Sequence, residues 1–328
     1  MAATIRDVAA AAGVSTATVS RALHAGAGVS PRTRLRVEEA ARRLEYRPSA
    51  TAARLASGRH GAVAFVVRGP LLSSGAEVLD GVCSTLAGAG LDCSLHLVPQ
   101  EAEFDASLLA DLAGRVDAAV VLAHTRLPRP PALPLPVVAV CAEVPGVPGA
   151  FVDLAAAASL AAGHLAAARY RQVAVLSDAG AGGDALARLV ESAAWAGGGR
   201  VRVVRHVAVA GAGSDDAARA AATVLADPSP PDALLCTSDR LVRGAARALQ
   251  LQGLMAGDDV GLLGIGGEQT GIDLEVSMVV EPRQLLGAAA AALAAELAAG
   301  APATGERVLL APQLMLRWST ARRRRILA

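Results

Sequence analysis

Residues 4–23 read TIRDVAAAAGVSTATVSRAL, and this stretch predicts two short helices joined by a tight turn. Thr4 can cap the first helix, and Asp7 can reach back to it from three residues further along. Gly13 permits a turn conformation that other residues resist, and Ser15 can cap the second helix. The apolar residues that can face inward together are Ile5, Val8, Val19 and Leu23.

The polar face of the second predicted helix carries Thr16, Ala17, Ser20 and Arg21. A short helix that presents small residues and one arginine fits the major groove of DNA, where an arginine can bond a guanine through two hydrogen bonds. The stretch therefore predicts a helix-turn-helix that binds double-stranded DNA.

Positive charge is concentrated at the start of the chain. Residues 1–60 hold ten arginines against four acidic residues, a net charge of +6, whereas the remainder holds 21 arginines against 26 acidic residues. A small basic head on a mildly acidic body is typical of a protein whose head alone binds nucleic acid. The chain has no lysine and no asparagine, so arginine is its only fixed cation.

Several classes of protein are disfavoured by the same sequence. No apolar run is long enough to span a bilayer, and the start has no signal-peptide pattern, so we expect a cytoplasmic, nucleoid-associated protein without a membrane partner. The four cysteines form no C-x-x-C pair, so we expect free thiols, no metal site and no cofactor. Neither a nucleophile elbow nor a phosphate-binding loop is present, so we expect no enzyme activity.

Further helices and strands follow the first two helices. Ser30-Pro31 predicts the start of a third helix, and the alanine-rich residues 49–57 predict a short helical stretch. We expect the apolar positions of the third helix to be Leu35, Val37, Ala40, Ala41 and Leu44. From Ala62 onward, short β-rich apolar runs alternate with helical stretches, which predicts buried parallel sheets covered by helices on both faces. The length of this part favours two sheets with a cleft between them.

Three motifs in the first 58 residues carry a resemblance to a known family. The opening motif is Thr4-Ile5-x-Asp7-Val8-Ala9-x-x-Ala12-Gly13-Val14-Ser15-x-x-Thr18-Val19-Ser20-Arg21-x-Leu23. Two more follow, Val29-Ser30-Pro31-x-Thr33-Arg34-x-x-Val37 and Leu44-x-Tyr46-Arg47-Pro48. Together they resemble the head of LacI/GalR-family transcriptional repressors. Ser49-Ala50-x-Ala52-x-x-Leu55 resembles the hinge helix of that family, Ser238-Asp239 its Asn-Asp pair, and Arg317-x-Ser319-Thr320 its closing motif.

The resemblance implies an α/β protein with an all-α head. Residues 1–48 would form a helix-turn-helix DNA-binding domain, and residues 49–60 a hinge helix and linker. Residues 61–328 would form an effector-binding and dimerisation core of two subdomains, similar to periplasmic binding proteins, with parallel sheets flanked by helices. The implied function is that of a repressor that binds a pseudo-palindromic operator as a homodimer.

The resemblance also implies roles for residues of the head and hinge. Arg21 reads a base, the alternative being a phosphate contact or a solvated arginine. Leu55 wedges into a base step of the minor groove, the alternative being packing on the core. The remaining predicted DNA contacts, most of them to phosphates that position without specifying, are Thr4, Ser15, Thr16, Ala17, Thr18, Ser20, His24, Arg32 and Ala52.

For the core, the resemblance implies a small-molecule effector, often a sugar, with Asp153, Arg188 and Asp239 as candidate contacts. Alternatively Asp239 caps a helix and Arg188 forms a surface ion pair. Two departures from the family stand out: residues 68–74 hold no aromatic side chain, and Gly264-Ile265-Gly266-Gly267 replaces Gly-Phe-Asp-Asp. Either the ligand is unusual or the cleft has lost its effector. A solute-binding protein is a weaker alternative, because the head is basic.

Overall fold

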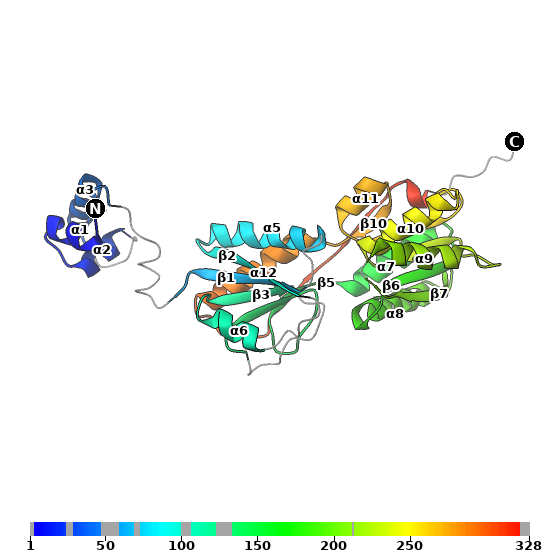
Figure 1. Cartoon of the computed structure of the whole chain (residues 1–328), viewed down its shortest axis with the longest axis horizontal. Coiled ribbons are helices and arrows are strands. Elements are labelled where there is room, and N and C mark those ends of the chain that lie inside the picture. The colour runs from blue at the N-terminus through cyan, green and yellow to red at the C-terminus, as the bar shows by residue number, and fades with distance from the viewer. Residues whose placement is uncertain are drawn as a thin grey trace. The chain divides into compact units, whose positions relative to one another are not determined.

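The computed structural model describes residues 3–23, 29–46, 59–68, 73–99, 106–122, 133–211 and 213–321. The chain divides into a small unit of residues 1–61 and a large unit of residues 62–328 (Figure 1). The predicted hinge helix, His24, Ala52 and Leu55 lie outside the described residues.

Three helices form the small unit: α1 (Ile5–Ala12), α2 (Thr16–Leu23) and α3 (Pro31–Arg43). Their shared core consists of Val8, Ala9, Ala12, Val19, Ala22, Val37, Ala40 and Ala41, with Ile5, Leu23 and Leu44 partly buried against it. Of the apolar positions of α3, Leu35 does not join this core, because it is 68% exposed. Positions 37, 40, 41 and 44 share one face of a helix, and residue 35 projects from the opposite side.

The first sheet of the large unit is six-stranded, with all its pairings parallel and the order β11-β5-β4-β3-β1-β2. Its strands are β1 (Ala62–Arg68), β2 (Asp92–Val98), β3 (Ala118–Leu122), β4 (Val137–Val140), β5 (Gly149–Val152) and β11 (Arg307–Leu310). Helices α5 (Ser73–Gly88) and α12 (Arg283–Ala298) pack in one apolar core against it. Helix α6 (Ala106–Ala113) packs in the other. We call this layered body the first subdomain.

The second sheet is also six-stranded, with the order β12-β10-β9-β8-β6-β7 and only β12 antiparallel. Its strands are β6 (Gln172–Asp178), β7 (Arg202–Val209), β8 (Ala233–Cys236), β9 (Gly261–Gly266), β10 (Ser277–Val280) and β12 (Gln313–Met315). Helices α7 (Leu154–Ala167) and α8 (Ala181–Ala196) share one core with it, and α9 (Ser214–Leu225) and α10 (Asp239–Leu251) share the other. With the short helix α11 (Glu268–Leu274), these elements form the second subdomain.

In the described part of the chain, the polypeptide passes between the two subdomains after β5, after β10 and after β11. The predicted fold class is confirmed: an all-α head precedes two parallel-strand sheets flanked by helices (Figure 1). Strands such as β3, β4 and β9 are buried along their whole length, as the continuous apolar runs predicted. Within the described residues, no helix is both long and apolar enough to cross a membrane.

The closing motif fastens the last part of the chain to the second sheet. The Ser319 hydroxyl donates to the Leu262 carbonyl at 2.5 Å and accepts from the Ser277 backbone N–H at 2.8 Å. Thr320 contacts the Ser277 hydroxyl at 2.7 Å and His164 Nε2 at 2.8 Å. These buried hydroxyls satisfy one another and hold the 3-10 turn Trp318–Thr320 against β9, β10 and α7.

Candidate nucleic-acid interface and core site

Capping interactions set the start of α1. The Asp7 carboxylate accepts hydrogen bonds from the Thr4 backbone N–H and from the Thr4 hydroxyl, both at 2.8 Å. These bonds to the charged form, the backbone one foremost, lower the pKa of Asp7. A carboxylate in the first helical turn also suits the positive end of the helix dipole. The predicted pairing of these two residues is present.

The turn between α1 and α2 follows from Gly13, whose φ of 63° lies in the left-handed region. The Val14 N–H then donates a hydrogen bond to the Ala9 carbonyl at 3.0 Å. Ser15 caps α2 by accepting from the Thr18 N–H at 3.1 Å, and its hydroxyl lies 2.9 Å from the Thr18 hydroxyl. Ser15 and Thr18, both predicted phosphate contacts, are therefore hydrogen-bonded to each other at the amino end of α2. Backbone N–H groups at a helix amino end favour an anion.

The outward face of α2 has the composition that the sequence predicted. Its side chains Thr16, Ala17, Ser20 and Arg21 are all exposed, whereas Val19 and Ala22 are buried on the opposite face. Arg21 Nε donates to the Ala17 carbonyl at 3.3 Å, which uses one of the five N–H donors of a guanidinium. Thr4 and Arg32, predicted as phosphate contacts, are also exposed.

The three predicted effector contacts lie on different elements of the core. Asp153 caps α7 at the first passage between subdomains, where its Oδ1 accepts from the Ala156 N–H at 2.9 Å. Arg188 is exposed on α8 and has no ion-pair partner within the described ranges. Asp239 is the first residue of α10, and only 14% of its side chain is exposed. The structure shows no contact that joins any two of these residues.

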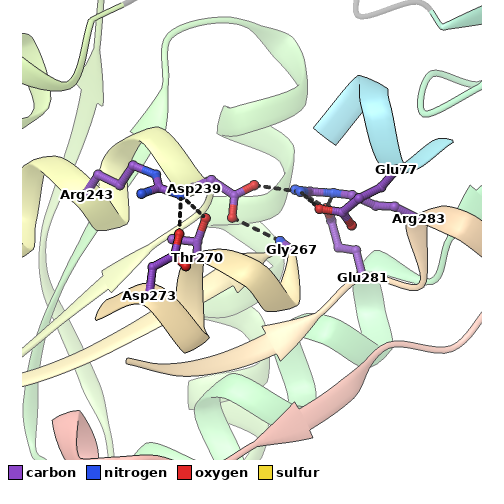
Figure 2. Close-up of polar contacts among 8 residues, drawn as sticks. All are labelled: Glu77, Asp239, Arg243, Gly267, Thr270, Asp273, Glu281 and Arg283. Atoms are coloured by element: carbon purple, nitrogen blue, oxygen red, sulfur yellow. Dashed lines mark hydrogen bonds and ion pairs between the residues drawn. The ribbon is translucent and has the colours of Figure 1, made fainter. Parts of the chain in front are cut away.

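Asp239 belongs instead to a cluster that the sequence did not predict, which we call the Arg283 cluster (Figure 2). It consists of Glu77, Asp239, Glu281 and Arg283. Nη1 of Arg283 lies 2.7 Å from Asp239 Oδ2 and 3.8 Å from Glu77 Oε1, and Nη2 and Nε lie 2.9 and 3.0 Å from Glu281 Oε2. Asp239 Oδ1 also accepts from the Gly267 N–H at 3.0 Å.

Burial and charge shift two pKa values in this cluster. Burial is the largest cause that raises the pKa of Glu77. The charge of Arg283 opposes this rise, and the nearby carboxylates Asp239, Glu281 and Glu268 add to it. Burial opposes the charge of Arg283, but Glu281, Asp239 and Glu77 together raise its pKa. The guanidinium therefore stays charged although only 8% of it is exposed.

Two glycines make room for the Arg283 cluster. A Cβ atom on Gly266 would lie 2.8 Å from Asp239 Oδ1, and one on Gly267 would lie 2.5 Å from Arg283 Nη1 and 2.9 Å from Glu77 Oε1. These are the positions where the family resemblance leads one to expect aspartates. One sequence signal points to this cluster: Arg283 follows Glu281-Pro282 directly and begins an alanine-rich helix that is apolar over most of its length.

Further ion pairs hold the same edge of the second sheet. Arg240 donates from Nε to Asp178, the last residue of β6, at 3.1 Å, and from Nη1 to the Gly213 carbonyl at 3.0 Å. Arg243 joins α10 to α11 through Thr270 at 3.2 Å and Asp273 at 3.3 Å (Figure 2). The carboxyl ends of parallel strands are where α/β proteins bind ligands. Many of the charged side chains at this edge are already paired with other residues of the chain.

Comparison with known proteins identifies relatives of both units. Residues 4–49 match the family model of bacterial regulatory proteins of the lacI family, and residues 162–320 match a periplasmic binding protein-like domain. The chain is 30% identical over 285 residues to the transcriptional regulator AglR of Rhizobium meliloti, covering 79% of this chain and 76% of that protein. It is 28% identical over 300 residues to the transcriptional regulator RafR of Escherichia coli, covering 86% and 88%.

Solved structures show the same fold over nearly the whole chain. The Lac repressor dimer bound to operator and the anti-inducer ONPF matches with a TM-score of 0.77 and 22% identity, over 98% of this chain and 99% of that one. A complex of the transcriptional regulator CelR with cellobiose matches with a TM-score of 0.68 and 25% identity, over 97% and 99%.

Proposed function

Since the chain belongs to the LacI family of bacterial regulatory proteins, which are DNA-binding transcriptional regulators and not enzymes, we propose that it is a repressor that binds a pseudo-palindromic operator as a homodimer. The observation that carries this proposal is the exposed face of α2, where one arginine stands among small side chains. A helix of this shape can approach base edges closely in the major groove. We expect the protein to act on the nucleoid, in the cytoplasm.

Within this proposal the residues of the head divide into two kinds. Arg21 reads a guanine, and Ala17 and Thr16 contribute at most an apolar contact or a phosphate bond. The residues assigned to phosphate contacts are Thr4, Ser15, Thr18, Ser20, His24 and Arg32. Leu55, with Ala52 nearby, is assigned to the minor groove on the family resemblance alone, as a wedge that bends the duplex.

Exposed apolar side chains support dimerisation through the core. Leu251 at the end of α10, Met255 just after it and Ile272 on α11 are 75%, 63% and 51% exposed. Helices α10 and α11 contact each other, and large exposed apolar side chains are a feature of interaction surfaces. A second copy of the chain is the occupant that a two-fold operator requires.

For the effector we propose a small molecule in the core that changes DNA affinity, with Asp153, Arg188 and Asp239 as candidate contacts and a sugar or related metabolite as the ligand class. A second candidate is a regulator whose core no longer responds to an effector. The Arg283 cluster favours this second candidate, because Asp239 is already paired and two glycines replace the expected aspartates.

Selection of bound duplexes from a random pool tests the DNA-binding proposal. We expect the full chain to enrich an inverted repeat, because two heads related by a two-fold axis read two half-sites. Repeating the binding with a metabolite library then separates the two candidates for the core. A chain that shows no preference for any duplex over scrambled competitor at moderate salt would contradict the proposal.

A further inference from the structure

The Arg283 cluster joins the two subdomains of the core. Glu77 lies on α5 and Arg283 begins α12, both of the first subdomain, whereas Asp239 begins α10 of the second. Glu281 lies in the passage between β10 and α12. One guanidinium therefore contacts carboxylates from both subdomains and from the segment that connects them (Figure 2).

The backbone that carries Arg283 is fixed firmly to the first subdomain. Helices α5 and α12 approach so closely that a Cβ on Gly81 would lie 2.0 Å from the Gln284 carbonyl oxygen, and one on Gly287 would lie 2.0 Å from the Val78 carbonyl oxygen. Gln284 also donates from Nε2 to Asp80 at 2.6 Å. The guanidinium thus extends from a rigid base towards Asp239 of the second subdomain.

Space and charge in the cluster both match a cation. Gly266 and Gly267 have no side chains, and side-chain atoms of the cluster lie in the space where their Cβ atoms would be. A single guanidinium faces the three carboxylates of Glu77, Asp239 and Glu281, and Glu268 adds negative charge near Glu77. Oε1 of Glu268 itself lies 3.9 Å from Nη2 of Arg317. A neutral polyol cannot offset this negative charge, whereas a planar guanidinium can bond carboxylates through paired N–H donors.

We propose that Arg283 is a tethered ligand whose guanidinium occupies a cation-binding site built by both subdomains. When the arginine side chain is removed, this site binds a small guanidinium cation from solution. For its regulatory consequence the inference rests on the proposed function. Because Arg283 bridges the two subdomains, the core keeps one arrangement of its subdomains without an added effector. The protein then keeps one DNA affinity.

Chemical rescue of the full-length Arg283→Ala variant tests the proposal. The probe is methylguanidinium at millimolar concentration, and N-methylurea is the neutral compound of nearly the same shape. We expect methylguanidinium to raise the unfolding midpoint of the variant by about 2–4 °C, and to leave the wild type unchanged because its place is filled. N-methylurea should raise neither midpoint.

Matched variants guard against a general effect on stability. Arg247→Ala removes an exposed ion pair to Asp215 within the second subdomain, and its midpoint should not respond to methylguanidinium. If Arg283→Ala does not fold alone, its refolding in methylguanidinium buffer becomes the readout, and Arg283→Lys should fold without the probe. The proposal is overturned if Arg283→Ala neither gains stability nor refolds with methylguanidinium, or if the wild type and Arg247→Ala respond equally.

The DNA measurement is kept separate from the cation measurement. Methylguanidinium binding to Arg283→Ala is followed by calorimetry without DNA, and operator affinity is then titrated with and without the cation. Cation binding in a chain that prefers no duplex would sink the proposed function and leave the tethered-ligand inference standing. Sequence-specific DNA binding without cation rescue would do the reverse.

Discussion

In the proposed operator complex, we expect sequence-specific binding to depend most on Arg21. Its neighbours Thr16, Ala17 and Ser20 are small and exposed, so they offer few bonds that could replace a lost bidentate contact. We expect Arg21→Ala to weaken operator binding by about 1–3 kcal/mol per half-site and to relax selection at one base pair in each half-site. Competition titrations with single-base operator variants measure both effects.

Arg42→Ala is the matched control, because Arg42 is an exposed head arginine that pairs with Glu39 on α3 at 2.9 Å. Its replacement should leave the base preference unchanged. A uniform loss of affinity for every duplex in Arg21→Ala would show instead that Arg21 contacts a phosphate.

His164 predicts a dependence of stability on pH. The side chain is partly buried on α7, and burial lowers its pKa below the usual value of 6.5. The unfolded chain therefore takes up a proton at a higher pH than the folded chain does. Stability is retained above pH 6.5 and falls as the pH drops through the window below it. We expect the stability advantage of wild type over His164→Gln to shrink between pH 7.5 and about 5.5, as measured by thermal unfolding. An advantage that grows on acidification would refute this account.

Single elements show where sequence reasoning succeeds. The start of α1, the Gly13 turn and the Ser15 cap depend on residues within five positions of one another, so their pattern is visible in the chain. The parallel strands are visible as continuous apolar runs. The Arg283 cluster unites residues 77, 239, 281 and 283, and no local pattern brings such distant positions together.

The contact between α5 and α12 provides a prediction at the scale of the element. In Gly81→Ala the new Cβ would meet the Gln284 carbonyl oxygen at 2.0 Å and the Ala288 nitrogen at 2.9 Å, so two backbones would have to separate. We expect a loss of about 1–3 kcal/mol in the free energy of unfolding, measured as a lower denaturant midpoint. Gly88→Ala on the same helix meets no atom within 4 Å and should cost nothing, since alanine favours the helix. Equal losses in both variants would mean that the helices are not in close contact.

The charge asymmetry of the whole molecule governs its response to salt. The first 60 residues carry +6 and the remainder carries a small excess of acid, so we expect the head to account for the counterions that are released when the protein binds DNA. Operator affinity should fall steeply with salt, and the logarithmic slope changes by about 0.9 for each phosphate contact. Arg32→Ala should weaken all duplexes alike and flatten the slope by about 2 in a dimer, one for each protomer. DNA titrations at several salt concentrations measure this slope. An unchanged slope in Arg32→Ala would show that Arg32 does not contact a phosphate.

In the proposed homodimer, two heads held together by the core bind a two-fold operator, and the first bound head gives the second a high effective concentration. Leu251→Glu places a charge on one of the large apolar side chains that are exposed near the carboxyl end of α10. We expect the dimer to dissociate at least about tenfold more readily, and operator affinity to fall with it at low protein concentration. Trp195→Glu is the control, since Trp195 is 83% exposed on α8, which packs in the other core of the second sheet. Sedimentation and operator titration are run on both variants. If Leu251→Glu keeps the mass of a dimer, then a different surface of the core joins the two copies, and the apolar side chains of α10 and α11 have another partner.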